Sequence, residues 1–300
     1  MSKALKILSR PQGNAEEYGR WAVNPYKGCS HGCLYCYLKK GVWANGLGGD
    51  TAELKTDVVS DEHAYHLAMA EIIENKEQII KDGGLFMTFT SDPMHHDTRK
   101  LFARIAEESI FYDIPVTILT KCADFYDPCC EQDDFPYELD MMVQNSDKTH
   151  LLAFGFTLTG HDELEPNAAP NADRIKTMKA LRDDHFKVWA SIEPVIDFPS
   201  ALDMVYQAVN AGCQHFKIGL LTNNTRLVRK DFEFGGHHFD AYKVNDCLHF
   251  VEDVMRMTSG KATVYWKQSV RDLFDGDGHI ILDQWPHSVG KDWNMFDKEG

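Results

Sequence analysis

The sequence has no long hydrophobic run. No segment of the 300 residues approaches the roughly 18 consecutive apolar residues that a membrane-spanning helix needs. The segment from Met1 to Arg10 also lacks the apolar stretch of about 7–15 residues and the small-residue cleavage site of a secretion signal. We therefore expect a soluble, cytoplasmic protein with no membrane partner.

Positive charge is in deficit. Lys and Arg number 31 against 46 Asp and Glu, so the formal net charge is −15 at pH 7. Such a balance repels a polyanion unless basic residues are concentrated on one face. The charge therefore disfavours a nucleic-acid partner, while leaving room for a local basic groove.

The sequence also lacks the regular cysteine spacing of a disulfide framework. Five of its eight cysteines are scattered, namely Cys122, Cys129, Cys130, Cys213 and Cys247. In a chain of this length, such a spread fits reduced cysteines in a cytosol. Cys122, Cys129 and Cys130 supply three of the roughly four thiolates that an auxiliary iron-sulfur cluster needs. A thiol that relays hydrogen and ordinary reduced cysteines are the alternatives.

The remaining three cysteines lie within eight residues. Cys29, Cys33 and Cys36 have the spacing C-x3-C-x2-C. Three thiolates on a short loop can ligate three irons of a [4Fe-4S] cluster and leave the fourth iron free to bind another ligand. Zinc usually takes four protein ligands, so a zinc site would need a distant fourth ligand or His31 inside the loop. The spacing predicts an open iron-sulfur cluster, with a zinc knuckle or incidental thiols as alternatives.

Short apolar runs alternate with helix-like segments along the chain. The expected strands are Trp21–Tyr26, Leu85–Thr90, Pro115–Thr120, Leu151–Thr157, Lys187–Glu193, His215–Leu220 and Ala262–Trp266. The expected helices lie near Glu62–Lys81, Thr98–Ser109, Ala172–Asp184, Ser200–Asn210 and Ala241–Met257. This alternation predicts an α/β fold with a parallel sheet. About six such units suit a partial (βα)6-type TIM barrel, which carries its chemistry at the carboxyl ends of the strands.

Two stretches interrupt the alternation. The acidic segment Cys122 to Thr149 contains two prolines and predicts an elaborated loop. After Gly276, aromatic side chains among polar residues predict a C-terminal extension that packs over the barrel or covers its mouth. We expect an N-terminal extension at residues 1–20, the core barrel at 21–225, and barrel completion with a tail at 226–300.

The residues around the cysteines form a more specific pattern than the cysteine spacing alone. The segment NPYKGCSHGCLYCY, residues 24–37, resembles the motif of the radical S-adenosylmethionine (SAM) superfamily, and in particular its spore photoproduct lyase-like branch. Similar segments follow in the same order: TFTSDP at 88–93, ILTK at 118–121, FTLT at 156–159, EPNAAP at 165–170 and SIEPVI at 191–196. The resemblance covers roughly Trp21 to Leu220 and implies the partial barrel of the radical SAM type.

The resemblance implies a role for each matching residue. Cys29, Cys33 and Cys36 would ligate the [4Fe-4S] cluster, and Tyr35 would lie near the adenine of SAM. The residues that would contact the rest of SAM are Thr90, Ser91 and Asp92 at its methionyl end, and Lys121 and Thr157 at its carboxylate and ribose. A lysine pairs well with a carboxylate, and a threonine hydroxyl hydrogen-bonds to ribose hydroxyls.

Ordinary structural roles fit three of these residues equally well. At its position, Lys121 fits equally well as a solvated loop lysine, and Thr157 fits as an ordinary strand threonine. Asp92 precedes Pro93, and an Asx-Pro pair commonly opens a turn. The residue types alone do not separate these roles from SAM binding.

The reaction implied by the resemblance starts with reductive cleavage of SAM at the cluster. It yields a 5′-deoxyadenosyl radical that abstracts hydrogen from a substrate, with a low-potential donor such as a flavodoxin or ferredoxin as partner. Spore photoproduct lyases return hydrogen from a cysteine near the end of the second strand, but this chain has no cysteine between Cys36 and Cys122. That difference argues against photoproduct repair.

The substrate is left open among a peptide, a small metabolite and a nucleobase. The acidic net charge favours the first two. Two further classes of protein stay open as alternatives: a non-catalytic iron-sulfur protein that transfers electrons or senses redox state, and a zinc-stabilised binding module.

Overall fold

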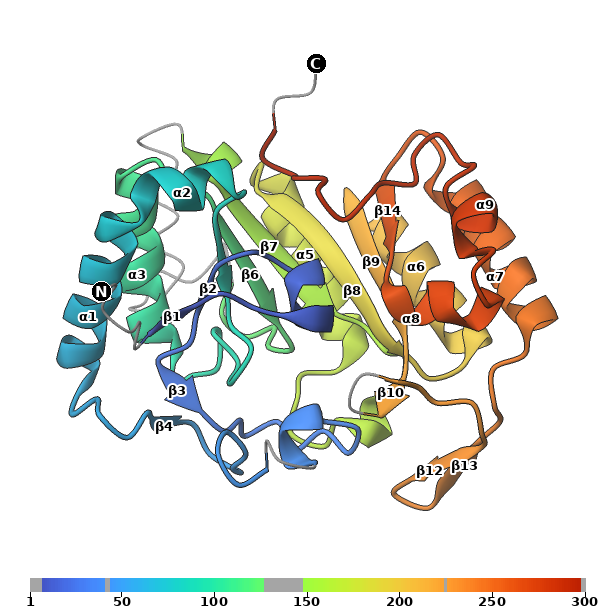
Figure 1. Cartoon of the computed structure of the whole chain (residues 1–300), viewed down its shortest axis with the longest axis horizontal. Coiled ribbons are helices and arrows are strands. Elements are labelled where there is room, and N and C mark those ends of the chain that lie inside the picture. Colours follow the sequence, from blue (N-terminus) through green and yellow to red (C-terminus); the bar gives the residue numbers. More distant parts are fainter. Residues whose placement is uncertain (1–6, 41–43, 127–147, 224–225, 298–300) are drawn as a thin grey trace.

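The computed structural model describes residues 7–40, 44–126, 148–223 and 226–297. Its centre is an eight-stranded sheet in the order β1-β2-β5-β6-β7-β8-β9-β14 (Figure 1). The strands are β1 (Leu8–Ser9), β2 (Ala22–Val23), β5 (Leu85–Met87), β6 (Val116–Thr120), β7 (Leu152–Thr157), β8 (Lys187–Val195), β9 (His215–Leu220) and β14 (Thr263–Trp266). Only β1 runs antiparallel to its neighbour. The seven parallel strands confirm the seven expected from the sequence.

Helices lie in five of the six connections between successive parallel strands, and part of the sixth, between β6 and β7, lies outside the described residues. They are α1 (Asp61–Glu74), α2 (Lys76–Lys81), α3 (Arg99–Phe111), α5 (Asn171–Asp183), α6 (Phe198–Asn210) and α7 (Val244–Thr258). In Figure 1, α1 and α3 flank the β2 side of the sheet and α7 lies beyond β14. The helix expected over residues 62–81 is divided at Asn75, whose side chain donates to the carbonyl of Glu71. An asparagine that bonds to its own backbone in this way competes with helix continuation.

Shorter elements decorate the two ends of the sheet. They are β3 (Tyr26–Lys27), β4 (Glu53–Leu54), β10 (Thr222–Asn223), β11 (Arg226–Leu227), β12 (Phe232–Phe234), β13 (His237–Phe239), α8 (Gln268–Arg271), α9 (Gly278–Leu282), and the 3-10 turns η1 (Gly13–Glu17), η2 (Tyr37–Lys39), η4 (Thr149–Leu151), η5 (Asp162–Leu164) and η6 (Asp272–Phe274). Figure 1 shows β3, β4, β10, β12 and β13 along its lower edge, beyond the carboxyl ends of the parallel strands.

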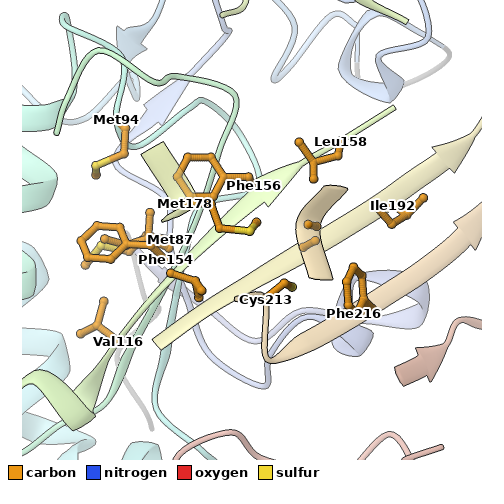
Figure 2. Close-up of a cluster of buried hydrophobic side chains, with 14 of the residues drawn as sticks. Met87, Met94, Val116, Phe154, Phe156, Leu158, Met178, Ile192, Cys213 and Phe216 are labelled. Carbon is orange, nitrogen blue, oxygen red and sulfur yellow. The ribbon is translucent and has the colours of Figure 1, made fainter. Parts of the chain in front are cut away.

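The main core lies between the sheet and its helices. Figure 2 shows Phe154 and Phe156 of β7, Ile192 of β8 and Phe216 of β9 gathered there, together with Met178 of α5. The opposite face of the sheet is also largely apolar, with a second cluster formed by Ala22, Phe86, Ala153 and Trp189. Burial on both faces is expected of a parallel sheet. The strands therefore read as apolar runs rather than as an alternating pattern.

A glycine in β7 makes room on this second face. A Cβ atom at Gly155 would lie 2.1 Å from the indole ring of Trp189, which is its register partner on β8. Any larger residue at this position would displace the indole.

The C-terminal segment crosses the amino ends of the strands. Its Trp293 ring stacks on His215, the first residue of β9, with centroids 4.2 Å apart, and Lys187 donates to the carbonyl of Met295. The tail thus packs over the sheet at the end opposite the cysteine loop. Residues 127–147 of the expected elaborated loop, with Cys129 and Cys130, lie outside the described residues. None of the described helices has the length and apolar character needed to span a bilayer.

Candidate functional site

The carboxyl ends of four neighbouring strands carry the residues expected to bind a cluster and SAM. The cysteine loop follows β2 and β3, and Thr90, Ser91 and Asp92 follow β5. Lys121 comes directly after β6, and Thr157 ends β7. Because parallel strands end at one edge of their sheet, these segments meet there (Figure 1).

The cysteine loop depends on glycine. Gly28 has φ +78°, and a Cβ there would lie 2.2 Å from the carbonyl oxygen of Thr51, so no other residue fits without rebuilding the loop. Leu34 N donates to the carbonyl of Leu164 at 2.9 Å, and Cys36 N donates to that of Cys33 at 3.2 Å. These bonds fix the loop against the segment after β7.

The thiols lie in surroundings that disfavour a free thiolate. Cys33 is buried, while Cys29 and Cys36 are half-buried. Burial, with the nearby Asp92 carboxylate, raises the pKa of the Cys29 thiol to about 12. Burial also raises the pKa of Cys33, and the nearby Lys121 ammonium partly offsets this rise. Because thiolates are the form that ligates metal, a bound cation would supply the charge that these sulfurs need.

The spacing of the sulfurs distinguishes metals. A tetrahedral zinc with Zn–S bonds of about 2.3 Å holds its sulfurs about 3.8 Å apart. Among the described residues, three groups have all their metal-ligating atoms within 4.8 Å of one another, and the cysteine triplet is not one of them. At least two of the three sulfurs therefore lie farther apart than in a formed zinc site.

One of those compact groups contains His31, Asp92 and Cys122. His31 Nε2 lies 2.8 Å from Asp92 Oδ2 and 3.8 Å from the sulfur of Cys122, and all three residues are buried. Asp92 also accepts hydrogen bonds from Met94 N, Thr120 Oγ1 and Lys121 N. Two donors on each carboxylate oxygen leave little capacity for a metal ion. The three residues therefore form a hydrogen-bonded group that holds the cysteine loop in place.

The pKa of Asp92 reflects this environment. Burial by itself would raise it, but the charge and hydrogen bond of His31, with the Thr120 hydroxyl and Lys121 amide, hold the pKa of the carboxyl well below its ordinary value. The carboxylate is thus ionised and fully engaged within the protein. Thr90 is engaged in a similar way, because its hydroxyl donates to the carbonyl of Tyr26 at 2.5 Å.

A fully buried ion pair supports Tyr35. Arg174 Nη2 lies 2.6 Å from Glu165 Oε2, and neither side chain is exposed. The Tyr35 hydroxyl donates to the other oxygen of Glu165, and Arg174 also donates to the carbonyl of Thr157 at 2.8 Å. The pair therefore connects the cysteine loop to the end of β7. Removal of either partner alone would leave the other as an unpaired buried charge.

Lys121 and Ser91 are two of the sequence-predicted residues with capacity left for a ligand. The Lys121 ammonium lies 5.7 Å from the Tyr35 ring centroid. Burial would lower its pKa, but Cys33 and Glu165 raise it above the ordinary value, so the side chain is charged. Ser91 Oγ is buried without a hydrogen-bond partner in the described residues. Thr157 shares the inner face of β7 with Ala153, according to strand alternation.

A second polar cluster lies across the sheet, at the ends of β8 and β14. Glu193 accepts from Lys267 Nζ at 2.5 Å and from the hydroxyl of Tyr18, which is also 2.7 Å from Ser191 Oγ. Gly219 makes room for it, since a Cβ there would lie 2.8 Å from Glu193 Oε1. The Glu193 side chain is 23% exposed, whereas that of Lys267 is 3% exposed.

Sequence reasoning missed most of these supporting residues. From the sequence alone, His31 is expected only as a possible zinc ligand, and Glu165 and Arg174 have no expected role. The usable signal is position, because Glu193 ends an expected strand and His31 lies within the cysteine loop. The partners of these residues are distant in sequence, and His31 and Asp92 are 61 positions apart. No local pattern marks such a pair.

Comparisons with known proteins find one distant relative by sequence and a fold shared with solved structures. No protein-family model matches the chain. Over 203 residues it is 25% identical to an uncharacterized protein of Methanocaldococcus jannaschii, and the match covers 62% of this chain and 64% of that protein. The matched region is thus less than two thirds of the relative's length.

Similar solved structures include several of spore photoproduct lyase, a radical SAM enzyme. The enzyme complexed with dinucleoside spore photoproduct has a TM-score of 0.56 and 15% identity, covering 89% of this chain and 81% of that one. A variant with bound AdoMet and the dinucleoside has a TM-score of 0.57 and 14% identity, covering 88% and 79%. At such identity the likeness shows the fold. The resemblance suggested by the motifs is confirmed at that level.

Proposed function

We propose that this protein, which shares the fold of spore photoproduct lyase, is a radical SAM enzyme. The observation that carries the proposal is the cysteine triplet at the carboxyl edge of the parallel sheet, beside the charged Lys121 and the unpartnered Ser91 hydroxyl. Cys29, Cys33 and Cys36 would hold a [4Fe-4S] cluster, which would supply the electron that cleaves SAM to methionine and a 5′-deoxyadenosyl radical. A low-potential donor such as a flavodoxin or ferredoxin reduces it.

The residues around the triplet divide into ligand contacts and supports. Lys121 pairs with the SAM carboxylate, and Ser91 donates to its methionyl end. Thr157 contacts the ribose, and Tyr35, held by Glu165, lies against the adenine. The partial barrel of the radical SAM type would enclose the ligand on the inner face of the sheet.

Two of the expected SAM contacts receive a different role in this proposal. Asp92 and Thr90 position the cysteine loop, since their side chains already bond to His31 and to the carbonyl of Tyr26. Their effect on SAM binding is indirect, through the position of the cysteine loop. Substitution of either residue should therefore alter cluster binding rather than a direct contact with SAM.

Photoproduct repair is not the proposed reaction. Cys122 follows β6, and its sulfur lies 3.8 Å from His31 within a buried group. It is therefore engaged behind the cysteine loop and does not replace the missing cysteine near the second parallel strand. With a net charge of −15, we propose a peptide or small metabolite rather than a nucleobase as substrate, bound near Glu193.

The experiment is SAM cleavage under anaerobic conditions. Protein reconstituted with iron and sulfide is incubated with SAM and dithionite, and 5′-deoxyadenosine is measured by mass spectrometry. We expect about four irons per chain, a broad absorbance near 400 nm and formation of 5′-deoxyadenosine. Four irons without this product would support a non-catalytic iron-sulfur protein. One zinc without the absorbance would support a zinc-stabilised binding module.

A further inference from the structure

A cavity lies at the end of the sheet opposite the cysteine loop. Its volume is about 450 Å³, within the range of small-molecule sites. Its wall includes Trp189 of β8 and His215 and Lys217 of β9, together with Tyr18 near the N-terminus and Trp293 of the tail. His215 is the first residue of β9, so the cavity is at the amino ends of the strands.

Two buried nitrogen atoms of this wall have no hydrogen-bond partner in the described part of the chain. They are Nε1 of Trp189 and Nε2 of His215, in residues that are 1% and 2% exposed. Trp189 and His215 are register partners on adjacent strands, and Lys217 follows two residues later on the same face. An unsatisfied buried polar group costs about 1–3 kcal/mol. Trp189 and His215 both line this cavity, and an occupant that reached their nitrogens would satisfy them.

The charge of the wall indicates which occupant. Lys217 Nζ donates to the backbone carbonyls of Glu17 and Tyr18 at 2.6 and 3.2 Å. The Glu17 carboxylate is engaged elsewhere, by the Tyr265 hydroxyl and Gln268 N. Burial, with the nearby Lys267 ammonium, lowers the pKa of Lys217 to about 7, although the Glu17 and Glu193 carboxylates act in the opposite direction. The two carboxylates therefore do not offset the burial of Lys217, and an anion in the cavity would add countercharge.

The rim of the cavity is already balanced. Arg10 pairs with Asp82 at 3.1 Å, Arg20 pairs with Asp292, and Lys291 pairs with Glu16. These ion pairs leave the attraction for an anion to the deeper wall. There the stacked rings of Trp293 and His215, 4.2 Å apart, provide a flat surface.

We propose that this cavity binds a small molecule that carries an oxyanion, either a carboxylate or a phosphate. Lys217 provides the positive charge, and the Trp189 indole donates a hydrogen bond. The site is separate from the cysteine loop and does not depend on the proposed SAM chemistry. Loss of SAM cleavage would leave the inference unaffected.

The test is a titration of the full-length, anaerobically purified protein with its cluster. The probes are sodium phosphate, sodium acetate and sodium benzoate, with sodium chloride at equal ionic strength as the blank. Binding is measured by calorimetry, and the indole N–H signal of Trp189 is followed by NMR after 15N-tryptophan labelling. Trp189→Phe assigns that signal, because it removes the N–H and keeps an aromatic ring.

We expect at least one oxyanion to saturate the protein and to shift the Trp189 indole signal. Lys217→Met should weaken that oxyanion about tenfold or more, equivalent to at least about 1.4 kcal/mol. Lys261→Met, an exposed lysine after α7, should bind like the wild type. The comparison of phosphate with the two carboxylates identifies the source of the anion.

Three results would overturn the inference: no saturation by any probe up to about 50 mM, far weaker than the millimolar range of weak specific sites; saturation that leaves the indole signal unmoved; or equal affinity in Lys217→Met. Should Lys217→Met fail to fold, the wild-type indole shift decides alone. A probe that binds without moving that signal binds elsewhere.

Discussion

His31 Nε2 lies 2.8 Å from Asp92 Oδ2, and both side chains are buried. This contact joins the cysteine loop to the carboxyl ends of two strands, because the same carboxylate accepts from Thr120 Oγ1 and Lys121 N. One carboxylate thus holds the loop and the ends of both strands together. The proposed cluster site depends on that carboxylate without being ligated by it.

Asp92→Asn should destabilise the protein. The amide keeps one acceptor oxygen but turns an NH2 group toward buried donors, and each donor left unsatisfied costs about 1–3 kcal/mol. We expect a loss of about 2–4 kcal/mol in the free energy of unfolding of the cluster-free protein, measured by urea denaturation. Asp97→Asn, at a side chain 46% exposed, is the control and should change little. Equal stability of both variants would contradict the anchoring role.

Acid should weaken the wild type more than Asp92→Asn. The folded pKa of Asp92 is lowered, so its stabilisation is present above the unfolded pKa of about 3.9 and is lost as pH falls toward the folded value. The difference in unfolding free energy between the two proteins should therefore shrink below about pH 4. Urea denaturation at a series of pH values between 3 and 6 measures it. A constant difference would show that Asp92 titrates normally.

Cys36→Ser should lose the cluster, whereas Cys213→Ser should keep it. Cys36 belongs to the triplet, but Cys213 donates to the carbonyl of His215 at 3.2 Å, a bond that a serine hydroxyl can replace. Iron content after anaerobic reconstitution should fall from about four to about one or fewer per chain for Cys36→Ser. Equal iron in the two variants would remove the triplet from the proposed site.

Lys121→Met should weaken SAM binding by about 10- to 100-fold. A hydrogen-bonded charge pair contributes about 1.5–3 kcal/mol, and Lys121 carries its charge beside the cysteine loop. Calorimetric titration of SAM into the reconstituted protein gives the affinity. Lys179→Met on α5 removes a surface lysine paired with Asp183 and should have no effect. Iron content must stay equal in all three proteins for the comparison to count.

The stability of Lys217→Met relative to the wild type should fall as pH rises. The pKa of Lys217 is about 7 in the folded protein and about 10.4 when unfolded, so the unfolded chain binds more protons between these values. Wild-type stability should accordingly gain up to about 1.4 kcal/mol per pH unit over this range, relative to Lys217→Met. Thermal and urea unfolding at pH 6 and pH 9 measure the change. No change between the two would mean that Lys217 stays charged.

The sequence determined the architecture closely. Apolar runs of five to seven residues alternate with amphipathic segments, and all seven expected strands occur in the sheet. Local patterns suffice here because strand and helix periodicity depend on residues near in sequence. The cysteine spacing likewise specified a candidate cluster, since ligand type and loop length are local properties.

The tertiary structure decided how the candidate residues divide between ligand contacts and supports. From the sequence, Asp92 and Lys121 have the same claim on SAM. Strand register and loop packing give Asp92 four donors inside the protein and leave Lys121 beside the thiols.

The cavity at the amino ends has the same origin. Trp189 and His215 become neighbours only when β8 pairs with β9, and Trp293 reaches them from the tail. The chemistry of each side chain is written in the sequence. Which buried groups find partners is settled by contacts between segments far apart in the chain, because hydrogen bonds and ion pairs require proximity that only packing provides.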